Sequence, residues 1–177
     1  MRLGIDLGGT KTEIAVISDD SSVVWTKRID TFAGSYSQIV TQISGLVNEA
    51  YEVTGYEGNV GISIPGSVSP DSSFIRGANT QVLNGRDFVN DLRVRIGRQV
   101  KVANDANCFT LSEATDGAAC DYINVFGVIL GTGCGGGLVI NDKLIEGRNR
   151  IAGEWGHTPL PWIEEHDLPR RHCWCGL

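Results

Sequence analysis

The chain has 177 residues, a net charge of −6 at pH 7, 41% hydrophobic and 20% charged residues, and 5 cysteines. This composition is typical of a globular protein and excludes an intrinsically disordered chain. The acidic balance without a Lys/Arg run argues against nucleic-acid binding, the absence of a long apolar stretch argues against a membrane span, and the odd cysteine count argues against a disulfide framework.

The first part of the chain predicts an α/β layer that opens on an antiparallel meander. The N-terminus has an acid and then glycines where a signal peptide needs an apolar core, so we expect a cytoplasmic protein. Hydrophobic periodicity predicts the following elements: strands at 2–6, 12–18, 23–29, 59–64 and 100–103, helices at 35–51, 87–98 and 105–119, and a polar loop at 67–83.

The pattern restarts near residues 116–122. A strand is expected at 125–130, a glycine-rich turn at 131–137 and a strand at 138–140. Residues 4–10 and 127–133 both join a strand to a glycine turn and another strand, which indicates a weak internal duplication and two lobes that hold phosphates between them. We expect a first domain at 1–117 and a second, partial one at 118–177. No following helix is predicted to cover the second sheet, which leaves one of its faces bare.

The first glycine turn has the composition of an anion site. Glycines let backbone N–H groups point at a phosphate, Thr10 adds a hydroxyl, Lys11 adds a cation, and Asp6 could hold Mg²⁺ through water. A Walker loop would enter a helix, whereas this turn enters a strand. A plain hairpin with an exposed lysine is the alternative. The candidate phosphate residues are Gly4, Asp6, Gly8, Gly9, Thr10 and Lys11.

The second glycine run is longer than a hairpin needs. Such a run costs backbone entropy on folding, so a phosphate cradle explains it better than a floppy surface hairpin. Its candidate phosphate residues are Gly131, Thr132, Gly133 and Gly135.

Asp105 follows a strand and begins a helix, between Asn104 and Asn107. An Asp in this position is often only a helix N-cap. The same position lies at the crevice where open α/β sheets bind ligands, and the helix dipole favours the ionised carboxylate. Asp105 is therefore a candidate general base, and the neighbouring amides could bind sugar hydroxyls.

Near the C-terminus, Glu154 could accept hydrogen bonds from sugar hydroxyls, although isolated Glu and His residues are commonly solvated surface groups. His157, Cys173 and Cys175 are plausible zinc ligands, but a closed structural site needs four. Without a fourth ligand, the cysteines would be free thiols.

These motifs together resemble the ROK family of bacterial sugar kinases and repressors, over the whole chain. Besides the first glycine turn, the stretches that carry the resemblance are Gly-Ile-Ser-Ile-Pro-Gly at 61–66, Leu-Asn-Gly at 83–85, Ala-Asn-Asp-Ala-Asn-Cys at 103–108, Leu-Gly-Thr-Gly-Cys-Gly at 130–135, Ala-Gly-Glu-Trp-Gly-His-Thr-Pro-Leu-Pro at 152–161 and Cys-Trp-Cys-Gly at 173–176.

The resemblance implies an actin-like (ribonuclease H-like) ATPase fold, with ATP, Mg²⁺ and a sugar in the cleft and Asp105 as catalytic base. It also implies a structural zinc held by His157, Cys173, Cys175 and one further cysteine, and it allows a homodimer. The implied sugar contacts are Gly66, Asn79, Asn104, Asp105, Glu154 and His157.

The resemblance is greatest to fructokinases and mannokinases, which phosphorylate a hexose such as fructose on its 6-hydroxyl, and then to N-acetylglucosamine kinases and glucokinases. The family continues after Cys-x-Cys-Gly with Gly-Cys-x-Glu and adenine-pocket elements, so this chain is expected to be truncated at its C-terminus. A sugar-sensing regulator and an inactive fragment are the alternatives to an active kinase.

Overall fold

The computed structural model describes residues 1–131, 133–159 and 161–168. Its larger sheet has five strands in the order β3-β2-β1-β4-β7. Antiparallel pairing joins β1 to β2 and β2 to β3, whereas β1, β4 and β7 are parallel. The strands are β1 (Arg2–Leu7), β2 (Lys11–Ile17), β3 (Val23–Asp30), β4 (Val60–Ile64) and β7 (Val100–Asn104), which confirms the predicted meander and α/β layer.

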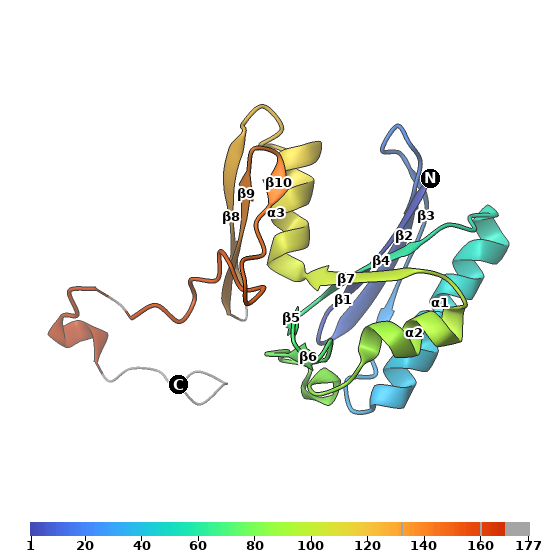
Figure 1. Ribbon diagram of the computed structural model, residues 1–177, viewed down its shortest axis with the longest axis horizontal. Coiled ribbons are helices and arrows are strands. Elements are labelled where there is room, and N and C mark those ends of the chain that lie inside the picture. The colour runs from blue at the N-terminus through green and yellow to red at the C-terminus, as the bar shows by residue number, and fades with distance from the viewer. Residues whose placement is uncertain (132, 160, 169–177) are drawn as a thin grey trace.

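Two helices cover one face of this sheet, α1 (Tyr36–Thr54) and α2 (Phe88–Ile96) (Figure 1). Each ends at a glycine in the left-handed conformation, Gly55 with φ 68° and Gly97 with φ 73°. This is the usual way to end a helix, since glycine adopts positive φ without a Cβ penalty. In β1 the side chains alternate, so that Leu3, Ile5 and Leu7 enter the core while Asp6 points to the other face.

The second sheet has three antiparallel strands in the order β10-β9-β8. These are β8 (Asn124–Leu130), β9 (Cys134–Ile140) and β10 (Lys143–Leu144). Helix α3 (Asp105–Thr115) follows β7 directly and packs on β8 and β9 (Figure 1). It is shorter than the predicted helix, and it connects the two sheets.

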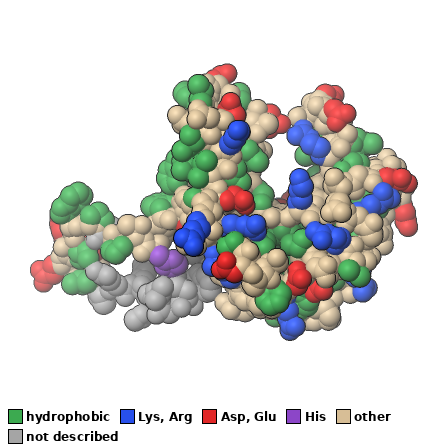
Figure 2. Space-filling view, in the orientation of Figure 1, with side chains coloured by type: hydrophobic (Ala, Val, Ile, Leu, Met, Phe, Trp, Pro, Cys, Tyr) green, Lys and Arg blue, Asp and Glu red, His purple; other side chains and the backbone are tan. Residues whose placement is uncertain are grey.

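The face of the second sheet away from α3 is apolar and exposed, as the sequence predicted. Phe126, Val128 and Leu130 alternate along β8 on this face and are 52%, 42% and 73% exposed. Figure 2 shows the hydrophobic side chains that gather over this part of the molecule.

The prediction of a glycine-rich turn over 131–137 was wrong, because β9 already begins at Cys134. Two of the strand glycines, Gly127 and Gly137, face α3 instead. A Cβ at Gly127 would lie 2.0 Å from Thr110 Oγ1, and one at Gly137 would lie 2.5 Å from the same atom and 2.8 Å from the Ala106 carbonyl. These glycines therefore allow close packing of helix on sheet, and that packing accounts for part of the glycine excess.

The segment predicted as a polar loop contains short regular elements. These are β5 (Ser67–Val68), β6 (Ile75–Arg76) and the 3-10 helix η1 (Gln81–Leu83). The Asn84 side chain accepts from the Ala78 N–H and donates to the Ala78 carbonyl, both at 2.9 Å. This double contact holds the loop that carries Asn79. A second 3-10 helix, η2 (Glu165–Asp167), ends the described chain.

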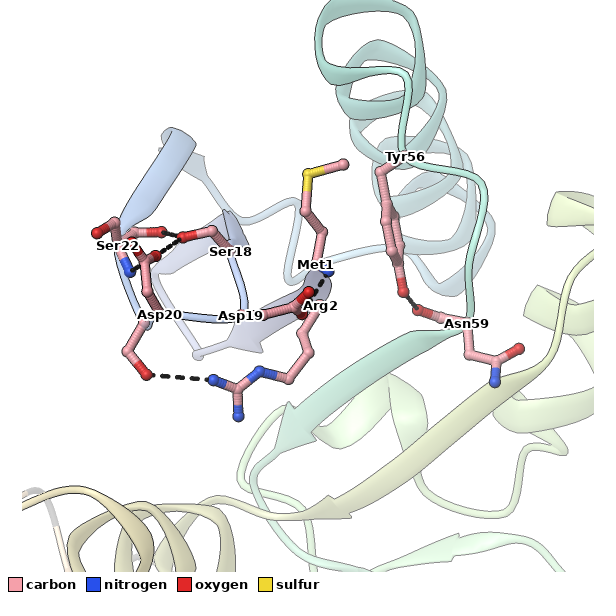
Figure 3. A network of polar contacts seen from close by, with 9 residues as sticks. Met1, Arg2, Ser18, Asp19, Asp20, Ser22, Tyr56 and Asn59 are labelled. Atoms are coloured by element: carbon pink, nitrogen blue, oxygen red, sulfur yellow. Dashed lines mark hydrogen bonds and ion pairs between the residues drawn. The ribbon is translucent and has the colours of Figure 1, made fainter.

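A polar network ties the start of β1 to the turn between β2 and β3 (Figure 3). The Met1 ammonium group contacts Asp19 Oδ1 at 2.7 Å, and Arg2 Nη2 donates to Ser21 Oγ at 3.3 Å. Ser21 Oγ in turn donates to Asp116 Oδ2 at 3.1 Å, at the C-cap of α3. The network lies at the end of β1 opposite to Leu7. Among the described residues, none of the helices is long and apolar enough to cross a membrane.

Candidate functional site

Asp105 is the first residue of α3, and the helix cap is its neighbour Asn104. Asn104 Oδ1 accepts from the Asn107 N–H at 3.1 Å, while Asn104 Nδ2 donates to the Gly66 carbonyl at 3.0 Å. Asp105 Oδ1 accepts from Asn104 Nδ2 at 3.0 Å and from the Ala106 N–H at 2.9 Å. The capping alternative therefore falls to Asn104, and Asp105 is accessible to solvent from the strand-to-helix crevice, although the surrounding atoms partly bury its carboxyl group.

A cavity of about 890 Å³ opens beside Asp105. Its volume is in the range of small-molecule sites. The cavity brings together all of the residues that the sequence predicted to contact a sugar. They come from the β4–β5 connection, the loop before η1, the β7–α3 junction and the segment after β10. These residues are Gly66, Asn79, Asn104, Asp105, Glu154 and His157. The second glycine motif contributes Gly133 and Gly135 to the same wall.

A smaller pocket of about 430 Å³ contains the first glycine turn. Asp6, Gly8 and Gly9 line it. Asp105 and Asn79 line both this pocket and the larger cavity. The Asp105 carboxyl thus lies between a glycine turn and a cavity of sugar-binding size, and it is not sealed in the core.

The pKa of Asp105 is raised above its ordinary value, first by burial of the carboxyl among cleft atoms and then by the negative charge of Asp6. The hydrogen bonds from Ala106 and Asn104 oppose this rise. Asp6 is itself held by Ser63, whose hydroxyl donates to Asp6 Oδ1 at 3.0 Å. The contact follows from the parallel register, in which Asp6 pairs with Ser63.

Glu154 and His157 reach the cavity because their segment lies against β9. A Cβ at Gly156 would be 2.1 Å from the Cys134 carbonyl, and Trp155 Nε1 donates to the Gly135 carbonyl at 2.9 Å. Burial and the charge of Asp105 raise the pKa of Glu154, while His157 lowers it. Both residues are exposed, and both line the larger cavity together with Asp105.

Some predicted phosphate residues lie outside both pockets. Lys11 forms an ion pair with Asp30, its direct cross-strand partner on β3. Thr10 and Gly4 do not line either pocket. Gly131 also does not line them, and Thr132 lies outside the described residues. Lys11 was predicted to face the phosphate pocket, but it does not line the smaller pocket. The β2–β3 register places it opposite Asp30, with which it pairs instead.

The smaller pocket contains a carboxylate that could bind Mg²⁺, whereas the described residues contain no set of zinc ligands. Mg²⁺ is commonly bound through one or two carboxylates and substrate phosphates, and Asp6 stands beside Gly8 and Gly9. Within the described ranges, no group of three or more His, Cys, Asp or Glu residues could hold a metal ion. Cys173 and Cys175 lie outside the described residues, so zinc remains a prediction.

Sequence reasoning missed several residues that the fold brings to the site. Ser63 and Cys108 line the smaller pocket, and Arg76 lines the larger cavity. The Arg76 guanidinium donates to the Asn149 carbonyl and so links β6 to the loop after β10. The sequence did contain a signal for Ser63. It lies between the buried strand residues Ile62 and Ile64, so its side chain points to the opposite face of the sheet, which is the face of Asp6.

The model of the ROK family matches residues 2–177. The chain belongs to the ROK family. The chain is similar to solved structures of sugar kinases of this family. Its fold is therefore the actin-like α/β fold that the resemblance implied.

Curated relatives of the chain include an N-acetyl-D-glucosamine kinase from Pectobacterium carotovorum, 45% identical over 180 residues. That match covers 99% of this chain and 59% of the relative, so the chain spans less than two thirds of the relative's length. A ROK glucokinase from Streptomyces griseus, solved with glucose and AMPPNP, is similar with a TM-score of 0.80 at 31% identity. The similarity extends over 90% of this chain and 50% of the glucokinase.

A ROK hexokinase from Thermus thermophilus is similar with a TM-score of 0.79 at 28% identity, over 99% of this chain and 57% of that one. The names of these proteins all describe sugar kinases. The expectation that fructokinases would be the most similar relatives finds no support among them.

Proposed function

We propose that this chain carries the acceptor site and the general base of an ATP-dependent sugar kinase. One observation carries the proposal: the Asp105 carboxyl borders both the sugar-sized cavity and the pocket of the first glycine turn. A kinase requires this arrangement, since the hydroxyl that attacks and the phosphate that is transferred must meet at the base.

Asp105 acts by accepting the proton of a sugar hydroxyl as that oxygen forms a bond to the terminal phosphorus. Its Oδ1 is held by Asn104 and Ala106, so we assign proton transfer to Oδ2. The bond between this phosphorus and the departing oxygen of ADP breaks in the same step. ATP would supply the phosphoryl group and Mg²⁺ would offset its negative charge. Asp6, Gly8 and Gly9 are the residues that would hold them in the smaller pocket.

The rest of the cavity orients the sugar. Asn79, Asn104 and Glu154 offer amide and carboxylate groups, which suit the donor and acceptor character of sugar hydroxyls. Burial and then the negative charge of Asp105 raise the pKa of Glu154, which favours its neutral form, a hydrogen-bond donor, more than in an ordinary glutamate.

We propose N-acetylglucosamine as the acceptor, which revises the expectation of fructose. Several curated relatives at 42% to 45% identity are named N-acetyl-D-glucosamine kinase, and these matches cover 99% of this chain. The predicted sugar contacts of this chain lie within the matched region. Fructose, mannose and glucose are the competing acceptors.

The test compares these four sugars. Their affinities for the 177-residue chain are measured by calorimetry. Turnover with ATP is measured for an extended chain, in which residues 1–177 are followed by the part of the Pectobacterium carotovorum relative beyond the matched region. We expect N-acetylglucosamine to give the largest kcat/KM. A larger value for fructose would restore the first expectation, and phosphorylation of no sugar would refute the kinase.

A further inference from the structure

The first glycine turn is held in place from the side of β3. Thr31 follows β3, and its hydroxyl donates to the Gly8 carbonyl at 3.0 Å. The Thr31 N–H donates to the Thr10 carbonyl at 2.9 Å. Thr31 lines neither pocket, so it acts on the site only through the backbone of the turn.

Hydrogen counting fixes the direction of a second contact. Thr31 Oγ1 lies 2.8 Å from Thr12 Oγ1, and either hydroxyl could donate. A threonine hydroxyl has one hydrogen, and Thr31 gives its hydrogen to Gly8. Thr12, which is fully buried, therefore donates to Thr31. A chain of two hydrogen bonds, from Thr12 to Thr31 and from Thr31 to Gly8, therefore connects the core of the first sheet to the first glycine turn. We call this chain the relay.

The orientation of one peptide plane follows from this relay. In a trans peptide, the carbonyl of one residue and the N–H of the next point in opposite directions. A Gly8 carbonyl turned toward Thr31 on the β3 side therefore directs the Gly9 N–H toward the β4 side. The smaller pocket lies on that side, where Ser63 and Pro65 line it. Among the described residues, the Gly9 N–H has no backbone acceptor.

The segment that carries Thr31 is itself fixed by α1. Gln42 Nε2 donates to the Asp30 carbonyl at 2.6 Å, and Gln42 Oε1 accepts from the Phe32 N–H at 3.4 Å. The two bonds bracket Thr31 on both sides. Its hydroxyl therefore points at Gly8 from a backbone that is held to a helix.

We propose that Thr31 is a positioning residue, which orients the Gly8–Gly9 peptide so that the Gly9 N–H is presented to a phosphate. The proposal rests on the proposed function only for the identity of the anion. The orientation of the peptide itself is independent of any activity.

The test uses the ¹⁵N-labelled 177-residue chain and inorganic tripolyphosphate as the probe. Thr31→Val removes the hydroxyl with little change of shape, and Thr31→Ser keeps it. Thr26→Val is the matched control, because Thr26 also donates a 3.0 Å hydrogen bond to a carbonyl, that of Ile14, within the same sheet. Thermal unfolding of each variant checks that it is folded.

Two quantities are measured: the residual dipolar coupling of the Gly9 N–H and the dissociation constant of tripolyphosphate from the Gly9 amide shift. In Thr31→Val we expect a changed Gly9 coupling, unchanged couplings in β1 and β4, and an affinity about 3- to 10-fold weaker, the loss of one net hydrogen bond. Thr31→Ser and Thr26→Val should keep the wild-type values.

An unchanged Gly9 coupling in Thr31→Val would overturn the inference, and so would equal changes in Thr26→Val. Tripolyphosphate that fails to shift Gly9 in the wild-type chain would contradict the proposed phosphate pocket. The dipolar coupling would still decide the role of Thr31 in that case.

Discussion

Asp6 and Asp105 line the same pocket, where burial and then the negative charge of Asp6 raise the pKa of Asp105. The two carboxylates come from β1 and from the start of α3, which follows β7 directly, and they meet because β1 and β7 both run parallel to β4. The sheet thus couples the charge of the phosphate site to the acidity of the proposed base.

The pKa of Asp105 should fall when Asp6 is neutralised. Carbon-13 NMR titration of the 177-residue chain should give a wild-type pKa above the ordinary carboxyl value of about 4. Asp6→Asn should lower it, because one negative charge is removed while the amide oxygen still accepts from Ser63. Asp71→Asn, on an exposed loop, is the control and should leave the pKa unchanged. An equal pKa in wild type and Asp6→Asn would contradict the coupling.

Asp105→Asn should stabilise the fold at neutral pH. The folded-state pKa of Asp105 is raised, so the native state disfavours the ionised form and stability decreases as pH rises from the unfolded pKa through the folded one. Melting temperatures should therefore differ at pH 7, with the variant higher, and the difference should shrink toward pH 4. A constant difference across this range would show that the charge is not its cause.

Gly127→Ala should destabilise the fold by about 1–3 kcal/mol, the usual cost of overpacking. The new methyl group would lie 2.0 Å from Thr110 Oγ1. Gly4→Ala is the control in β1, where a Cβ meets nothing within 4 Å, and it should be neutral or stabilising by about 0.5–1 kcal/mol.

Chemical denaturation measures these changes, and Thr110→Ala checks their cause. In the Thr110→Ala background, Gly127→Ala should cost less, because the hydroxyl and methyl groups that it meets are gone. Equal costs in both backgrounds would place the strain elsewhere.

Sugar affinity should depend on Gly66. This residue has φ +86°, and a Cβ would lie 2.5 Å from the Arg76 carbonyl and 2.7 Å from the Ala78 N–H. Gly66→Ala should therefore displace the loop that presents Asn79 and weaken sugar binding by about 10-fold. Gly97→Ala is the control: its φ of +73° gives similar backbone strain with nothing within 4 Å, so calorimetry should find a destabilised protein with unchanged sugar affinity.

Much of the five-stranded sheet and its helices was predictable because the signals for these elements are local. Alternation in β1, the apolar stripe of α1 and the strand-to-helix step at Asp105 each depend on neighbours in sequence, and each is found in the structure. The helix predicted at 35–51 extends to Thr54, where Gly55 supplies a left-handed C-cap. That glycine was a readable signal that the periodicity alone did not use.

The errors concern residues whose role depends on tertiary partners. Gly127 of β8 and Gly137 of β9 are explained by the approach of Thr110, which lies at least 17 positions earlier in the chain. Lys11 pairs with Asp30 because of the β2–β3 register, which the sequence did not determine. Only the structure of the first turn of α3 shows that Asn104 caps the helix, so that the Asp105 carboxyl is not needed as the cap.

Turnover of Asp105→Asn tests the central claim most directly. In the extended chain with ATP and N-acetylglucosamine, kcat should fall by at least about 10²-fold, the contribution of a general base. The sugar dissociation constant should change little, because the amide preserves the shape of the cavity wall and the Oδ1 acceptor. Turnover equal to that of the unsubstituted extended chain would contradict the assignment of Asp105 as the base.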